Sequence, residues 1–575
     1  MDSRSSHTRI GKAVTSDCSH VGHAAGNTKA KIKRSDFPKD FVFGSATSAY
    51  QVEGAWNTGG KGLSNWDVFT MRTPGKIHGG TNACTTINQY SRIKDDVALI
   101  KKVGLDSYRF SIAWSRVLPG GRLSAGINQE GIDYYNKIID LLLAEGIEPC
   151  ATIFHWDVPQ CLEDEYEGFL DTRIVSDFCE FAEVCFWEFG DRVKYWITLN
   201  EPWSFAVQGY VTGHFPPARG QDSVEPITSH SFHRGKPGAR FHCSKRKPGT
   251  EPYKVAHNLI LSHAQAVDIY RQRYQAHQGG KIGVTNVSQW FEPLHHTSED
   301  KDAASRAIDF MLGWFVEPIV KGHYPSTMRA NVGDRLPKFS HEQTKLVKGS
   351  YDFLGINYYT SIYARNSPRK HCTNPSYETD QEITLSDERD GKPIGPKAGS
   401  HWLNIVPHGI YDLLVHIKKK YDDPIIYITE NGGRRRRQGR RGEEDEDEDE
   451  EDEDKDITLK SHIQRGRGRE EEEEDEEEEV DEDEDITLKS HIQGRQGRGG
   501  EDDDEDEDED EEEDEEDITL KTWSLNANIV IPSMDIQCDK FSLSRQVDVF
   551  LILDSILSNI EALHVMDLKD AVSDG

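Results

Sequence analysis

The chain has 575 residues, enough for one large barrel or for two or three ordinary domains. Its formal net charge of −34 suggests a strongly acidic protein, but residues 434–517 alone hold 45 acidic and 14 basic side chains, a net charge of −31. The other residues therefore carry about −3, an ordinary enzyme surface, so the acidity excludes no class of substrate. The nine cysteines have neither metal-ligand nor disulfide-framework spacing, and those in apolar runs are expected in the core.

The beginning of the chain is polar, and residues 1–36 are predicted to form a disordered leader. A small basic cluster, Lys31–Arg34, reads as a solvated tail or as part of a nuclear signal. The leader has no apolar core of signal-peptide length, and no run of about 18 apolar residues follows. We therefore expect a cytoplasmic or nuclear protein without a membrane span.

From residue 41 onward, segments with helical periodicity alternate with apolar, β-branched segments. This alternation, with strands apolar on both faces, indicates an α/β fold whose parallel sheet is covered by helices. Since polar residues gather where the strands end, a (β/α)8 TIM barrel is the best fit. Residues 219–250, rich in Gly, Pro and His, are expected to form a loop over its mouth. Residues 41–51 are expected to form a first core strand that opens into an active-site loop. The further expected strands are 107–112, 148–155, 193–199, 281–285, 351–359 and 425–429, and the expected helices are 95–103, 134–145, 174–189 and 254–276.

The composition changes abruptly after Gly433, where an arginine-rich run is followed by three blocks of Glu and Asp. A short element, Asp-Ile-Thr-Leu-Lys, recurs at 456–460, 485–489 and 517–521. The sequence between its copies is almost pure charge, so no repeat could bury a face against its neighbour, and a solenoid is excluded. Residues 434–521 are therefore predicted to be a disordered acidic low-complexity segment.

Residues 522–575 regain apolar content and form an atypical tail. Within it, 528–531 is predicted as a short strand and 547–563 as an amphipathic helix. The expected organisation is thus a leader at 1–36, a barrel domain at 37–433, an acidic segment at 434–521 and this tail.

Two stretches share one pattern, an apolar strand that ends on a glutamate. Tyr195–Trp203 reads Tyr-Trp-Ile-Thr-Leu-Asn-Glu-Pro-Trp, and Pro424–Gly432 reads Pro-Ile-Ile-Tyr-Ile-Thr-Glu-Asn-Gly. A single glutamate at a strand end is more often a surface residue, but two such carboxylates suit glycosidic bond cleavage, which needs an acid/base and a nucleophile. The apolar approach to Glu201 favours a raised pKa and hence the role of general acid.

Both stretches resemble the two motifs of glycoside hydrolase family 1, the β-glucosidase family, and the resemblance runs from about Phe37 to Gly432. Within plants the chain is similar to the β-glucosidases of monoterpene indole alkaloid metabolism, of the raucaffricine and strictosidine glucosidase type. The segments that carry this narrower likeness are 115–124, 186–190 and 309–315.

The resemblance implies catalytic roles for specific residues. Glu201 matches the acid/base and Glu430 the nucleophile of a retaining mechanism. Arg109 matches the arginine that keeps the nucleophile charged, and Tyr359 the tyrosine that hydrogen-bonds to it. Asn357 is expected to orient this network. Taken alone, Arg109 and Tyr359 would be structural residues.

The same resemblance implies a sugar site. Gln51, His155 and Asn200 match the positions that bind the glucose 2-, 3- and 4-hydroxyl groups, and Trp402 matches the tryptophan that stacks on the aglycone. Without the resemblance, His155 and Trp402 would be read as core residues. The expected partner is a small-molecule β-glucoside, and no cofactor or metal is implied.

The sequence departs from the family after Glu430. Family members continue to an eighth strand that ends in a Trp-Ser…Asp-Asn-Phe-Glu-Trp motif, whose Glu and Trp hold the sugar. That motif is absent here, and Trp523-Ser-Leu-Asn526 is only a faint echo of it. The barrel is therefore predicted to be incomplete, with its eighth strand and last helices missing or replaced, which would expose strand edges.

Three functions remain open from the sequence. The first is retaining hydrolysis of O-β-glucosidic bonds in a plant alkaloid or monoterpenoid glucoside. The second is a catalytically inactive family member that associates with an intact β-glucosidase, as a homo- or hetero-oligomer. The third is an acidic nuclear interaction protein that acts through residues 434–517. A membrane or nucleic-acid partner is not expected.

Overall fold

The structure is a computed structural model that describes residues 33–77, 80–219, 247–368, 374–400 and 402–432, together with the backbone of 550–554. The chain divides into two units, residues 1–41 and residues 42–575. In the first unit, the described residues form one 3-10 turn, η1 (Arg34–Asp36). All further elements belong to the second unit.

The second unit is built on a closed barrel of eight strands in the order β1-β13-β12-β7-β5-β4-β3-β2. Every pair of neighbours in this barrel is parallel. The predicted (β/α)8 class is thus confirmed. The strands are β1 (Val42–Ala46), β2 (Ser107–Ser111), β3 (Glu148–Phe154), β4 (Tyr195–Asn200), β5 (Lys281–Val287), β7 (Phe353–Asn357), β12 (Ile426–Asn431) and β13 (Phe550–Asp554).

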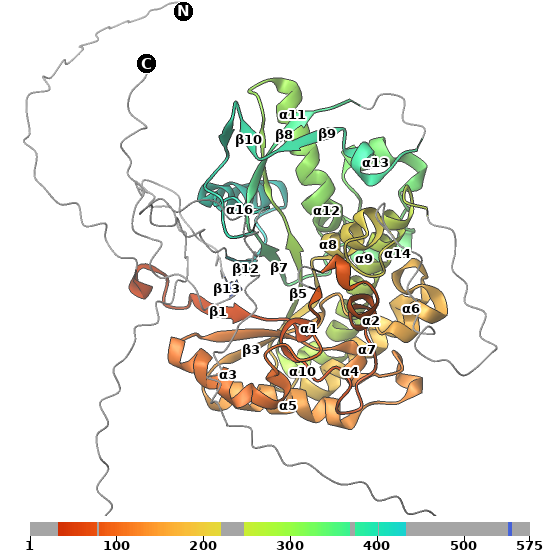
Figure 1. The fold of residues 1–575 in the computed structure, drawn as a ribbon, viewed down its shortest axis with the longest axis vertical. Helices are drawn as coiled ribbons and strands as arrows, with labels where there is room; N and C mark the ends of the chain where they lie inside the picture. Colours follow the sequence, from red (N-terminus) through yellow and green to blue (C-terminus); the bar gives the residue numbers. More distant parts are fainter. Residues whose placement is uncertain are drawn as a thin grey trace, which may run out of the picture. The chain divides into compact units, whose positions relative to one another are not determined.

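The eighth position of the barrel is taken by β13, from the tail of the chain (Figure 1). It pairs with β1 on one side and with β12 on the other. The eighth strand is thus replaced, and the helix predicted at 547–563 is wrong over 550–554. Periodicity alone cannot tell whether a short apolar run is a buried strand or part of a helix. Here the run becomes a strand because β1 and β12 provide hydrogen-bond partners on its two sides. The acidic segment and the strand predicted at 528–531 lie outside the described residues.

Helices surround the barrel strands (Figure 1). In α7, buried side chains recur at the spacing of one helical face, from Ile174 through Phe178, Phe181 and Cys185 to Phe189, and this helix packs against α9. The predicted helix at 254–276 occurs as α9, η8 and α10 in succession. The main helical elements of this unit are α3 (Gln89–Val103), α5 (Gln129–Ala144), α7 (Arg173–Phe189), α9 (Glu251–Ile269), η8 (Tyr270–Tyr274), α10 (Gln275–Gln278), α11 (Ser298–Ile308), η9 (Asp309–Gly313), α12 (Trp314–Lys321), α14 (His341–Val347) and α16 (Pro407–Lys420).

Shorter elements lie in the connections between these strands and helices. Two small sheets are formed by β6 (Trp290–Pro293), β8 (Ser361–Asn366) and β9 (Ile383–Ser386), and by β10 (Glu388–Arg389) and β11 (Lys392–Pro393). The short helices are α1 (Ala49–Val52), α2 (Asn65–Arg72), η2 (Pro74–Lys76), α4 (Trp114–Val117), η4 (Leu123–Ala125), α6 (Gln160–Tyr166), η5 (Gly168–Leu170), α8 (Pro202–Val207), η6 (Gln208–Thr212), α13 (Ser326–Val332), η10 (Gly333–Arg335) and α15 (Tyr377–Gln381).

An apolar layer fills part of the barrel interior. Side chains from five strands meet there, namely Ala46, Cys150, Ile197, Phe353 and Tyr427. The rings of Phe353 and Tyr427 stack with their centroids 4.3 Å apart. This layer makes the barrel a packed core rather than a pore. No helix in the described part of the chain is long and apolar enough to cross a bilayer.

Candidate active site

The first strand-terminal glutamate, Glu201, directly follows β4. The pairing of β4 with β5 shifts register between Ile197 and Asn200, and Glu201 itself adopts a left-handed backbone with φ of 42°. A register shift and a strained backbone both redirect side chains, and both concentrate at functional sites. Pro202 begins α8 immediately afterwards. The carboxyl group of Glu201 is buried, with only 6% of the residue exposed.

The second glutamate, Glu430, lies in β12 and has a similar setting. The pairing of β12 with β7 shifts register between Ile428 and Glu430, and Glu430 is also 6% exposed. Its two oxygens accept from charged and phenolic donors: Arg109 Nη1 lies 2.6 Å from Oε1, and the Tyr359 hydroxyl lies 2.6 Å from Oε2. A buried carboxylate is stable only when it is paired and hydrogen-bonded, as here.

Arg109, from β2, joins four strands of the barrel. Its Nε donates to Thr152 Oγ1 at 2.9 Å, its Nη1 to Glu430, and its Nη2 to Asn200 Oδ1 at 2.6 Å. The residue is fully buried. Since a guanidinium presents its donors in a rigid fork, these bonds fix the positions of β3, β4 and β12 side chains relative to one another.

The network continues from Asn200 to Glu201 through Asn357 of β7. Asn357 Nδ2 donates to Glu201 Oε1 at 2.6 Å and lies 3.3 Å from Asn200 Oδ1. The amide of Asn200 in turn lies 2.9 Å from His155 Nε2. One continuous set of hydrogen bonds therefore connects the two carboxyl groups and the candidate sugar-binding histidine.

The two carboxyl groups have different electrostatic surroundings. Burial and, to a lesser extent, the negative charge of Glu430 raise the pKa of Glu201 to about 7, against the lowering effect of hydrogen bonds from Asn357 and Ser204 and of the Arg109 charge. Glu430, by contrast, forms an ion pair with Arg109 at 2.6 Å. Glu201 can therefore hold a proton near neutral pH, as a general acid must, whereas Glu430 lies against a cation.

His155 is neutral in this site. Burial lowers the pKa of its imidazole well below the usual range, and the positive charge of Arg109 lowers it further. Asn200 Nδ2 points at Nε2, so Nε2 accepts and the proton lies on Nδ1. Nδ1 is buried without a hydrogen-bond partner among the described residues. A neutral N–H donor of this kind suits an uncharged hydroxyl group.

Two of the sequence-predicted residues stand apart from this network. Gln51 lies in α1 and is exposed, and no hydrogen bond within the described residues joins its side chain to the other candidates. Trp402 is 51% exposed, and its ring meets that of Tyr359 edge-on with centroids 6.1 Å apart. The exposed indole next to Tyr359 provides an aromatic wall.

Ser204 contacts the site but was not predicted from the sequence. Ser204, in α8, lies with its Oγ 2.7 Å from Glu201 Oε2 and is 7% exposed. The signal that could have found it is spacing, because a hydroxyl three residues after a glutamate at a helix start lies on the same face.

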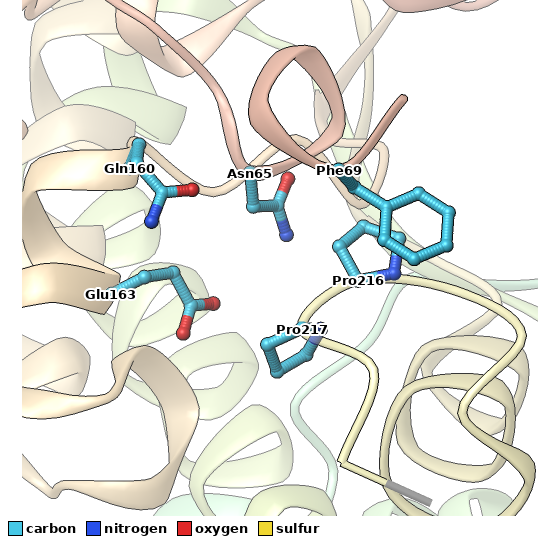
Figure 2. Close-up of a pocket in the computed structure, with 6 residues that line it drawn as sticks. All are labelled: Asn65, Phe69, Gln160, Glu163, Pro216 and Pro217. Atoms are coloured by element: carbon cyan, nitrogen blue, oxygen red, sulfur yellow. The ribbon is translucent and has the colours of Figure 1, made fainter. Parts of the chain in front are cut away.

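A separate cavity lies between α2, α6 and the segment around Pro216, which Figure 2 shows in close-up. Its volume of about 10 Å³ is close to the smallest that holds one water molecule, so it cannot take a sugar. None of its lining residues is a candidate site residue. They are Asn65, Phe69, Gln160, Glu163, Pro216 and Pro217.

The described residues offer no group of three or more His, Cys, Asp or Glu side chains that could hold a metal ion.

Comparison with known proteins places this chain in a family. The model of glycosyl hydrolase family 1 matches residues 33–467. The chain is 60% identical over 436 residues to oleuropein β-glucosidase of Olea europaea, covering 75% of this chain and 79% of that protein. It is 55% identical over 413 residues to raucaffricine-O-β-D-glucosidase of Rauvolfia serpentina, covering 71% and 76%.

Solved structures of β-glucosidases are also similar to this chain. The crystal structure of rice Os3BGlu6 β-glucosidase superposes with a TM-score of 0.65 at 47% identity, covering 70% of this chain and 81% of that one. A mutant of that rice enzyme in a covalent complex with Glc matches with the same TM-score at 46% identity, covering 70% and 81%. The chain belongs to glycosyl hydrolase family 1, and its relatives named here are β-glucosidases.

Proposed function

We propose that this protein hydrolyses the O-β-glucosidic bond of a plant specialised-metabolite glucoside by a retaining double displacement. The observation that carries the proposal is the pair of buried carboxyl groups at the ends of β4 and β12. Hydrogen bonds through Arg109, Asn200 and Asn357 link them, but the partner of Glu430 is a cation and that of Glu201 is a neutral amide. Retention requires two carboxyl groups about 5–5.5 Å apart, one protonated and one ionised.

In the first step, an oxygen of Glu430 attacks the anomeric carbon while the proton of Glu201 passes to the glycosidic oxygen. The bond between that oxygen and the anomeric carbon breaks, and the aglycone leaves as an alcohol. In the second step, water loses a proton to Glu201, its oxygen bonds to the anomeric carbon, and Glu430 is released as a carboxylate. The covalent complex with Glc of the similar rice enzyme supports this route.

The glucosyl group is proposed to bind against His155 and Asn200. Both are almost fully buried and lie in the hydrogen-bond network of the two glutamates. A site built to hydrogen-bond hydroxyl groups disfavours analogues that lack them, because unmatched buried polar groups cost about 1–3 kcal/mol each. The aglycone is proposed to lie against the exposed face of Trp402.

The class of aglycone is proposed from the relatives. The names of two of the similar proteins given above describe glucosidases for oleuropein and raucaffricine. An alkaloid or monoterpenoid glucoside, with a rigid apolar aglycone, fits a half-exposed indole better than a flexible sugar chain does.

The test is turnover of p-nitrophenyl β-glucoside, oleuropein and raucaffricine by the full-length protein, with the anomer of the released glucose followed by NMR. We expect hydrolysis of the aryl glucoside, preference for one plant glucoside over cellobiose, and β-glucose as the first product. First release of α-glucose would overturn the retaining route.

Absence of turnover in a protein with a cooperative thermal transition would instead identify an inactive family member. The protein without residues 433–575 is not a suitable control, because β13 lies within them. The matched control is therefore Glu430→Gln in the full-length chain, which keeps the volume and removes the nucleophile.

A further inference from the structure

Ser204 occupies a defined position against the acid/base carboxyl. It is the third residue of α8, and its hydroxyl lies 2.7 Å from Oε2 of Glu201, in the interior of the protein. The left-handed backbone of Glu201 precedes this helix directly. No other hydrogen bond of the described residues reaches Oε2, so Ser204 is its protein partner.

The other oxygen of this carboxyl group is committed as an acceptor. Asn357 Nδ2 lies 2.6 Å from Oε1, and an amide nitrogen can only donate. The orientation of that amide is set by its neighbours: Thr429 Oγ1 lies 2.7 Å from Asn357 Oδ1, and Asn357 Nδ2 faces Asn200 Oδ1. Arg109 can only donate, so the atom of Asn200 that faces it is the oxygen Oδ1. The nitrogen of Asn357 is then the atom that faces both Asn200 Oδ1 and Glu201 Oε1.

Oε1 has two lone pairs and Asn357 occupies one of them; no hydrogen bond of the described residues offers an acceptor to a proton on the other. Oε2 is different, since a serine hydroxyl both donates and accepts. It can accept from a protonated Oε2 and donate to an ionised one.

We propose that Ser204 is a positioning residue that confines the catalytic proton to Oε2 of Glu201 and reverses its own hydrogen bond when that proton leaves. The inference rests on the proposed function and adds to it the atom that carries the proton. When Oε2 protonates the glycosidic oxygen, the serine O–H turns to donate to the new carboxylate oxygen. When water returns a proton to Oε2 in the second step, the serine turns back. The hydroxyl proton stays on the serine throughout.

Other charged groups also act on this carboxyl, and the test must separate them from Ser204. Glu430 approaches from β12 and Arg109 from β2, and their charges act on Glu201 in opposite directions. His155, which directly follows β3, is neutral, so its imidazole adds no charge. A substitution at Ser204 leaves all three unchanged.

The experiment compares Ser204→Ala with Ser204→Cys and Ser204→Thr in the full-length protein. Loss of the hydroxyl removes a donor from the ionised form, so the alkaline limb of kcat/KM is expected to move to higher pH in Ser204→Ala. For a glucoside with a poor leaving group, which needs the proton, kcat/KM should fall about tenfold. For 2,4-dinitrophenyl β-glucoside, which leaves without a proton, kcat/KM should stay within about twofold. Ser204→Thr, which keeps a hydroxyl, should have the alkaline limb and the kcat/KM of the parent protein. Ser204→Cys, whose thiol is a weak donor, should have values between those of the parent and of Ser204→Ala.

A readout without turnover keeps this test independent of the proposed function. The carboxylic acid band of Glu201, identified by its loss in Glu201→Gln, is followed against pH by infrared difference spectroscopy. A higher titration midpoint in Ser204→Ala would support the proposal even in a protein that hydrolyses nothing. An unchanged midpoint, or an equal loss of kcat/KM with both leaving groups, would reduce Ser204 to a packing residue and overturn the inference.

Discussion

The ends of β4 and β12 are built alike and behave differently. Each is an apolar strand with a register shift just before its glutamate, and each glutamate is 6% exposed. Yet Glu201 receives neutral donors, Asn357 and Ser204, whereas Glu430 receives the guanidinium of Arg109 and the hydroxyl of Tyr359. Equal burial with unequal partners is what separates an acid from a nucleophile.

We infer that the role of each carboxyl group is set by the residues that other strands bring against it rather than by its own strand. Arg109 comes from β2 and Tyr359 follows β7, and both approach Glu430. Changing the partners should therefore change the roles, and each prediction below tests one side of the comparison.

The largest effect is expected for Glu430→Gln. The amide cannot attack the anomeric carbon, so kcat should fall by about 10⁴-fold or more on every glucoside. Steady-state hydrolysis of p-nitrophenyl β-glucoside measures it, with thermal unfolding as the control for folding. Retention of more than a few per cent of the activity would exclude Glu430 as the nucleophile.

On the other side of the comparison, Glu201→Gln should lower kcat/KM by about 10²–10⁴-fold for glucosides with poor leaving groups. The loss should be far smaller for 2,4-dinitrophenyl β-glucoside, because that aglycone leaves without a proton. Added azide should raise kcat with the dinitrophenyl substrate and release β-glucosyl azide, since azide attacks without a general base. A uniform loss across leaving groups would contradict the assignment.

Arg109→Met tests the ion pair. It leaves the Glu430 carboxylate buried without a cation, which should lower the free energy of unfolding by about 3–5 kcal/mol. Urea denaturation measures the loss, and Arg109→Lys, which keeps the charge but not the fork of donors, is the matched control. Equal stability of Arg109→Met and the parent would show that the pair is not structural.

The pH dependence tests the acid directly. Because burial raises the pKa of Glu201 to about 7, and the protonated form is the active one, kcat/KM for p-nitrophenyl β-glucoside should be lost as pH rises through that value. The fall should approach about tenfold per pH unit well above it. The same measurement in Glu201→Gln should lack this limb. A limb that survives in the variant would belong to another group.

The smallest effect is expected for Tyr359→Phe, which removes one of the two donors to Glu430 and leaves the ion pair intact. A lost hydrogen bond of this kind corresponds to about 1–1.5 kcal/mol, or roughly a five- to tenfold lower kcat/KM. A loss of kcat/KM larger than the one that Arg109→Met shows in the same assay would mean that the hydroxyl, not the guanidinium, holds the nucleophile.

Much of this molecule could be predicted from the sequence. Seven of the barrel strands and four of the long helices were predicted from apolar periodicity, and the two glutamates were identifiable because each ends an apolar strand. Tail residues resisted prediction: 550–554 read as part of a helix but pair as a strand between β1 and β12. The edges of β1 and β12 offer backbone hydrogen bonds to an extended segment between them, which stabilises a strand there. The local sequence pattern of 550–554 contains no information about those edges.

By itself, the sequence determined the barrel class and the presence of two carboxyl groups at strand ends, because both depend on local patterns that the chain carries wherever it folds. The resemblance already implied that Arg109 faces Glu430, whereas only the tertiary structure showed Ser204 against Oε2 and Asn357 against Oε1 of Glu201. Those contacts depend on register shifts in β4 and β12 and on strands distant in the chain, and hydrogen bonds at 2.6–2.7 Å tolerate no other register.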